Sequence, residues 1–167
     1  VLDEQQQVLL TTMADKLLIT LLAKLSNFVP NAGIWMNTLR PEWNDANNAL
    51  VGYGASMVTL AYIRRYMSFL QEFIVSDVNI ATETYTLLQA LHSALRMPST
   101  KQVTDMAGLA GEQYRQKAYA GLSGQIVTLT LCELRTFLSD TLEVIDSSIR
   151  NNKCANGLYH AYNLIRF

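Results

Sequence analysis

A strong charge of either sign is missing from this chain, as is a long uninterrupted apolar run. Its 167 residues carry 13 Lys and Arg against 14 Asp and Glu, for a formal net charge of −1. Nucleic acids and anionic membranes usually bind a basic surface, so this balance predicts neither as a partner. The most apolar stretch, residues 8–29, contains Asp15, Lys16 and Lys24, whereas a membrane span needs about 20 mostly apolar residues. No secretory signal is recognisable, and the compartment stays undetermined.

Cysteine and the common cofactor motifs are also scarce. The two cysteines, Cys132 and Cys154, do not have the spacing of a metal-binding pair, and a disulfide between them has no support. Cys132 lies in an apolar run and is expected in the core. No P-loop, dinucleotide fingerprint, zinc spacing or nucleophile elbow is present. The sequence therefore predicts no cofactor and no metal, since an acidic loop without an EF-hand pattern is weak evidence for Ca²⁺.

The chain does contain a series of helical patterns. Apolar residues recur at spacings of three, four and seven over 3–28 and again over 55–75. A third helix is expected over 79–96, before Pro98. Ser99, with Gln102 three residues on, predicts the N-cap of a fourth helix that runs to residue 120. A fifth is expected over 125–150, and its apolar part, 126–138, is expected to be the most buried.

No run alternates apolar and polar residues as a strand does, and residues 158–167 look like the start of a further helix. Most connections are short, which favours antiparallel helical hairpins. The predicted fold class is therefore all-α, with residues 1–167 forming a single helical segment.

One connection is much longer than the others. Residues 29–54 show no clear periodicity, and a loop of that length in a compact domain is usually functional or disordered. Disorder is disfavoured because the loop is rich in aromatic and aliphatic residues. Both tryptophans of the chain, Trp35 and Trp43, lie in it. We therefore interpret this loop as the functional part of the chain.

The loop has the side chains of a sugar-binding site. The indole faces of Trp35 and Trp43 can stack on the apolar face of a pyranose. Arginine and asparagine side chains give directional hydrogen bonds to hydroxyl groups, and the candidates are Arg40, Asn44, Asn47 and Asn48. Two carboxyl groups, Glu42 and Asp45, stand among them. A carboxyl group near apolar rings has its acidic form favoured by desolvation, as a general acid requires.

A purely structural interpretation of the same residues stays open. Asn44 or Asp45 could cap a following helix while Trp43 fills the core, and two carboxyl groups three residues apart form either a site or two caps. A second polar-aromatic cluster at 159–163 contains His160. We count His160 as a further substrate-binding candidate, with a partly buried helical histidine as the alternative.

Residues 42–52, EWNDANNALVG, resemble the Asp-Trp-Asn-Asp-Gly-Met-Asn…Val-Gly segment of cellobiose and chitobiose phosphorylases. Those enzymes belong to the six-hairpin (α/α) toroid glycosidase superfamily. In them the last Asp of Trp-Asn-Asp is the general acid that protonates the glycosidic oxygen, and the resemblance gives that role to Asp45. Trp43 would line the sugar subsite, and Glu42 stands where the family has Asp. Ala46 and Asn47 depart from the family's Gly and Met.

The resemblance implies an incomplete part of a larger (α/α)-toroid catalytic domain, because a full toroid needs more helices than this chain offers. The remainder of its own polypeptide or a complementing chain would complete it. The implied activity is cleavage of a glycosidic bond in a carbohydrate substrate, by hydrolysis or by phosphorolysis with inorganic phosphate as a second partner. The family's phosphate-binding residues are not recognisable here. The competing expectation is a non-enzymatic helical scaffold, or a carbohydrate-binding segment, with a structural Trp/Asn loop.

Overall fold

The computed structural model describes residues 2–36, 50 and 52–165. The helices in these ranges are α1 (Met13–Leu25), α3 (Met57–Phe73), α4 (Thr82–Leu95), α5 (Thr100–Ala120) and α6 (Leu131–Asn151). The strands are β1 (Phe28–Val29), β2 (Gly33–Trp35), β3 (Gly54–Ser56), β4 (Val78–Ala81), β5 (Ile126–Leu129) and β6 (Tyr162–Leu164).

The prediction of an all-α fold built from helical hairpins is wrong, and with it the assignment to an (α/α) toroid. The described residues form five helices and six strands, and the strands make two antiparallel sheets. The strands are two to four residues long, so alternation of apolar and polar residues has no length over which to show. Their partners lie far away in the sequence, which local periodicity does not reveal. The chain is mixed α/β.

Strand pairing also moves several predicted helix ends. Residues 79–81 and 126–129, expected to be helical, instead belong to β4 and β5, which pair antiparallel. Ile126 is 64% exposed, so the expectation that 126–138 is the most buried segment is wrong. Cys132 is exposed rather than in the core. Residues 162–164, expected to be helical, form β6.

Side-chain caps mark where α1, α5 and α6 begin, whereas α4 starts directly after β4 with no side-chain cap. The first helix starts at Met13 rather than residue 3, because the Thr12 side chain accepts a hydrogen bond from the Asp15 amide at 3.1 Å. The predicted cap of the fourth helix is confirmed, since the Ser99 hydroxyl accepts from the Gln102 amide. At α6, Thr130 and Glu133 form a complete capping box.

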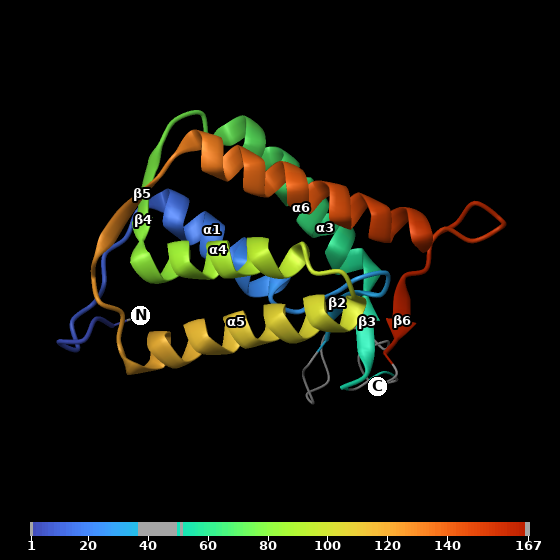
Figure 1. Cartoon of the computed structure of the whole chain (residues 1–167), viewed down its shortest axis with the longest axis horizontal. Coiled ribbons are helices and arrows are strands. Elements are labelled where there is room, and N and C mark those ends of the chain that lie inside the picture. The colour runs from blue at the N-terminus through green and yellow to red at the C-terminus, as the bar shows by residue number, and fades with distance from the viewer. Residues whose placement is uncertain (1, 37–49, 51, 166–167) are drawn as a thin grey trace.

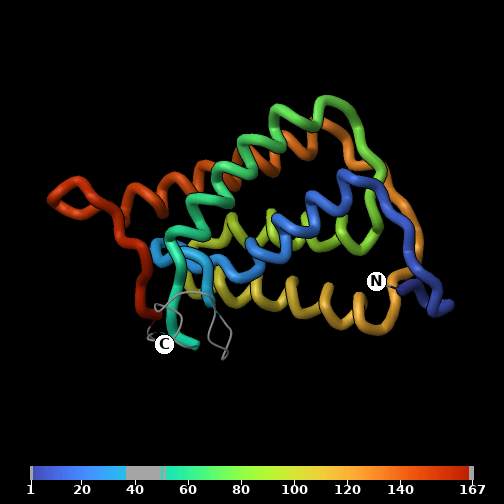
Figure 2. Tube along the Cα trace, turned by 180° about the vertical axis from the view of Figure 1, so that it is seen from behind, coloured from blue at the N-terminus to red at the C-terminus, as the bar shows by residue number. Residues whose placement is uncertain are grey.

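The helices lie between the two sheets. Figure 1 shows the four-stranded sheet at one end of the molecule and the β4–β5 pair at the other. In both views α3 and α6 lie side by side as one layer, α1 and α4 fill the middle, and α5 forms the opposite side (Figures 1 and 2).

The core follows from this stacking. Leu22 of α1, Leu60 of α3, Leu91 of α4 and Phe137 of α6 are all 0% exposed. Full burial of such a side chain is worth about 1.5–3 kcal/mol. Phe28 of β1 and Ile34 of β2 belong to the same core, so the four-stranded sheet is packed directly onto the helices. Among the described helices, none has the length and apolar content to cross a membrane.

Candidate functional site at the base of the β2–β3 hairpin

The four-stranded sheet fixes the two ends of the segment that contains the predicted motif. Its strand order is β1-β2-β3-β6, with antiparallel neighbours. Trp35 is in register with Ala55, and the Met36 amide donates to the Gly54 carbonyl at 2.8 Å. The Ile165 amide donates to the Tyr53 carbonyl at 2.7 Å. The chain therefore leaves β2 and enters β3 at one defined place.

Two glycines, one at each end of the β2–β3 pairing, have other atoms very close to their Cα. A Cβ on Gly33, whose φ is +120°, would lie 2.7 Å from the Ser56 carbonyl oxygen. A Cβ on Gly54 would lie 2.6 Å from the end of the Met36 side chain. Both distances are well inside van der Waals contact. At Gly33 the contact is with backbone, so this position requires a glycine. At Gly54 the Met36 side chain can move, and the less mobile obstacle is the Leu50 Cβ at 2.8 Å.

Trp35 is the predicted substrate-binding residue that the structure places most clearly. Its indole Nε1 donates to the Gly52 carbonyl at 3.0 Å, and its backbone amide donates to the Asn27 carbonyl at 2.8 Å. The side chain is half-buried against the small apolar cluster of Val29, Ala55 and Ile165. The hydrogen bond to Gly52 and the contacts with this cluster fix the orientation of the indole ring.

Trp35 also lines a groove of about 520 Å³, which we call the α5 groove. It runs between α5 and the end of α1, and its aromatic members are Trp35, Tyr114 and Tyr119. Tyr119 is 84% exposed, which is high for an aromatic side chain. Gly108 and Gly111 form part of the α5 wall. A Cβ on Gly111 would lie 2.5 Å from the Ser26 Cβ, whereas one on Gly108 would have no atom within 4 Å.

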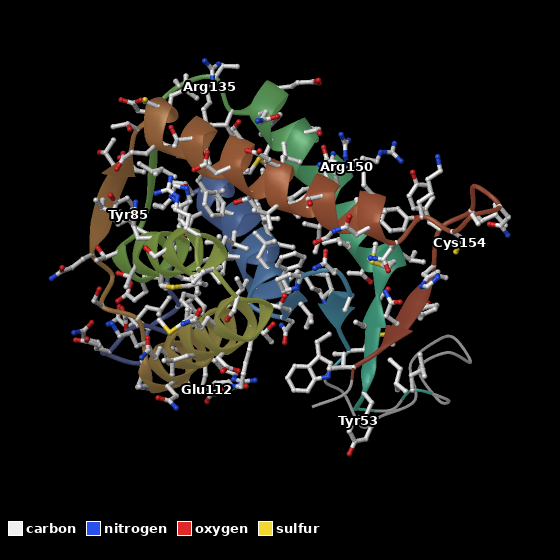
Figure 3. The ribbon with its side chains drawn as sticks, turned by 45° about the vertical axis from the view of Figure 1, so that its right-hand side comes forward. Tyr53, Tyr85, Glu112, Arg135, Arg150 and Cys154 are labelled. Carbon is white, nitrogen blue, oxygen red and sulfur yellow. The ribbon has the colours of Figure 1, made fainter. Side chains whose placement is uncertain are left out.

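The charges of the α5 groove cancel. Glu112 and Arg115 both line it and form an ion pair one turn apart on α5. In Figure 3, Glu112 of α5 and Tyr53, which directly precedes β3, both lie at the lower edge of the molecule. Burial raises the pKa of the Tyr114 hydroxyl, although a hydrogen bond with Thr84 opposes the shift. Tyr114 is thus an uncharged hydroxyl at neutral pH.

His160, the other predicted binding residue that is described, lies elsewhere. It lines a separate cavity of about 650 Å³ between α3 and the end of α6, together with Tyr62 and Arg65. Its Nδ1 is 2.9 Å from Asn163 Oδ1. The structure therefore does not bring His160 and Trp35 into one cavity.

A buried asparagine holds the segment around His160. Asn152 Nδ2 donates to the carbonyls of Asn31 at 2.9 Å and Ser148 at 2.8 Å, and its Oδ1 accepts from Asn163 Nδ2 at 2.7 Å. These bonds join the β1–β2 turn, the end of α6 and β6. The polar residues around His160 therefore have a structural role, because they connect β6 to the end of α6 and to the β1–β2 turn.

The remaining predicted site residues lie outside the described residues. They are Arg40, Glu42, Trp43, Asn44, Asp45, Asn47 and Asn48.

Sequence reasoning missed the α5 groove. Its lining comes from α1, β2, α4 and α5, which only the folded chain brings together. One local signal was available, because Gly108 and Gly111 stand inside a helix. Each costs about 1 kcal/mol relative to alanine, which points to close packing or an open face.

A third cavity, of about 550 Å³, lies between α4 and α5 around Glu83. Glu83 is 8% exposed, and its Oε1 accepts from the Ser123 amide at 2.9 Å. Burial favours the neutral acid, but the hydrogen bonds from Ser123 and the nearby charge of Lys117 outweigh it, so the pKa of Glu83 lies below its ordinary value. Glu83 therefore anchors the connection that follows α5.

Over the described ranges, no group of three or more His, Cys, Asp or Glu side chains is arranged to hold a metal ion. Comparison with known proteins adds no family: no protein-family model matches the chain, and no curated protein matches it.

Proposed function

We propose that this chain is part of a carbohydrate-active protein in which Asp45 acts as the general acid that cleaves a glycosidic bond. The observation that carries the proposal is the position of Trp35. This ring lines the α5 groove, and in the sequence only Met36 separates Trp35 from the 37–49 segment that contains Asp45. An anchored indole face beside an open groove suits the apolar face of a pyranose.

In the proposed reaction, the Asp45 carboxyl donates its proton to the glycosidic oxygen as the bond from that oxygen to the anomeric carbon breaks. Water or inorganic phosphate then forms the new bond at the anomeric carbon. Hydrolysis with inversion requires a second carboxylate about 6.5–9.5 Å from the acid, to deprotonate the water. Glu42 is close to Asp45 in sequence, so the base can equally come from outside this chain. Phosphorolysis requires no base.

The test compares wild-type full-length protein with Asp45→Asn on a panel of β-glycosides, with and without inorganic phosphate. Released sugar and sugar phosphate are both measured. Removal of a general acid is expected to lower kcat by about 10²–10⁴-fold. Asp105→Asn is the matched control, because Asp105 is an exposed aspartate that pairs with Lys101 on α5. Equal rates for wild type and Asp45→Asn would remove Asp45 from this role.

Carbohydrate binding without catalysis is the second candidate. One observation favours it: among the described residues that line the α5 groove, the sole carboxylate is Glu112, which is already paired with Arg115. The described residues of the groove could therefore bind a glycan, but they include no free carboxyl group to act as a general acid. Glycan binding with no turnover by the wild-type protein would select this function.

A further inference from the structure

We infer that the α5 groove is an extended subsite for a neutral, linear oligosaccharide, which lies along α5 with one end at Trp35. This inference rests on the proposed function in taking carbohydrate as the ligand class. It adds the size and charge of the ligand, and it assigns Tyr119 and Tyr114 as binding residues beside Trp35.

The first argument is the aromatic lining. Trp35 comes from β2, while Tyr114 and Tyr119 come from the second half of α5, and all three line one groove. Tyr119 keeps 84% of its surface exposed, and an exposed aromatic face loses unfavourable contact with water when a sugar ring covers it. Separate aromatic faces along one groove suit successive sugar units.

The second argument is length. The α5 residues that line the groove extend from Thr104 to Tyr119, which is about 22 Å along a helix at 1.5 Å per residue. In Figures 1 and 2 the four-stranded sheet lies beside the N-terminal end of α5. Trp35 is therefore at one end of the groove and Tyr119 at the other. A single sugar ring would cover a small part of this length.

The third argument is charge. Within the described part of the lining, Glu112 and Arg115 are the charged residues, and they neutralise each other. A groove for an acidic glycan would carry an excess of basic side chains. Paired with each other, these side chains still present hydrogen-bonding edges to neutral hydroxyl groups. The volume of about 520 Å³ lies within the range of about 300–1,000 Å³ that is usual for ligand sites.

The test measures binding of cello-oligosaccharides of increasing length to the full-length protein by calorimetry. Affinity should rise over several sugar units, and an oligogalacturonide of equal length should bind more weakly. Tyr119→Ala should weaken binding of the longest ligand by roughly 2- to 10-fold. Tyr62→Ala is the control, because Tyr62 is a 67% exposed tyrosine on α3 outside the groove.

A second variant blocks the groove without removing a contact. Gly108→Leu places a side chain where a Cβ meets no atom within 4 Å, so the helix is expected to stay folded while ligand is excluded. Met106→Leu, at an exposed α5 position outside the groove, is its control. Folding of both is checked by thermal melts.

The outcomes separate this inference from the proposed catalysis. Unchanged affinity in both Tyr119→Ala and Gly108→Leu would overturn the extended subsite, as would equal affinity for one sugar unit and for many. Loss of binding in these variants, together with unchanged turnover in Asp45→Asn, would support the subsite and refute the assigned acid.

Discussion

Gly33→Ala should destabilise the β2–β3 pairing, whereas Gly108→Ala should not. Gly33 has a φ of +120°, and an added Cβ would lie 2.7 Å from the Ser56 oxygen, 2.8 Å from the Ser56 carbonyl carbon and 3.0 Å from the Met57 nitrogen. All three atoms are backbone, so a change of side-chain rotamer cannot relieve the contact. The β2–β3 pairing itself must shift.

The magnitude follows from two costs. A non-glycine residue in such a backbone conformation costs about 1–3 kcal/mol, and overpacking adds about 1–3 kcal/mol. The free energy of unfolding should therefore fall by about 2–6 kcal/mol, a large part of the roughly 5–15 kcal/mol that stabilises an ordinary domain. For a chain of this size each kcal/mol corresponds to about 2–4 °C in Tm.

The assay is urea unfolding followed by far-ultraviolet circular dichroism, with a thermal melt beside it. Gly108→Ala is the matched control, because its Cβ would meet no atom within 4 Å and alanine favours a helix interior by about 1 kcal/mol. Gly108→Ala should raise the midpoint while Gly33→Ala lowers it. Equal midpoints for the two variants would refute the claim that the sheet requires a glycine at position 33.

Two further predictions concern buried polar groups. Asn152→Ala should cost about 1–3 kcal/mol in urea unfolding, because it leaves the Asn31 and Ser148 carbonyls without these hydrogen bonds. Asn151→Ala removes an exposed hydrogen bond to Asn31 Oδ1 and should cost less than Asn152→Ala, so equal losses would contradict the role of Asn152. Glu83 has a lowered pKa in the folded state, so its ionised form adds stability that is present above the ordinary glutamate pKa and is lost as the pH falls through the folded value. Glu83→Gln should thus be less stable than wild type at neutral pH and should converge with it in acid, and a pH-independent difference in unfolding midpoints would contradict this linkage.

Local signals predicted the helices better than the sheets. Ser99 and Gln102 marked the start of α5 correctly, because a cap depends on residues next to one another in sequence. The strands depend on distant partners: β3 pairs with residues 162–164, and β4 pairs with residues 126–129. An apolar run such as 126–138 then gives no indication of which residues face water, and both Ile126 and Cys132 are exposed.

In the candidate site, too, some residues could be identified from local sequence, whereas others depend on contacts between distant segments. Trp35 could be selected from the sequence because tryptophan in a long loop is unusual. Tyr114 and Tyr119 could not, since a tyrosine in an amphipathic helix is ordinary until a groove is found beside it. The position of His160 in a different cavity likewise depends on the pairing of β6 with β3.

The assignment of Asp45 as proton donor is tested most directly by changing the leaving group. The rates of wild type and Asp45→Asn should be compared on a simple alkyl β-glycoside and on the dinitrophenyl glycoside of the same sugar. A general acid matters when the departing oxygen needs a proton, so kcat should fall by about 10²–10⁴-fold on the alkyl glycoside and far less on the dinitrophenyl glycoside. An equal loss on both substrates, or no loss on either, would contradict the role of Asp45.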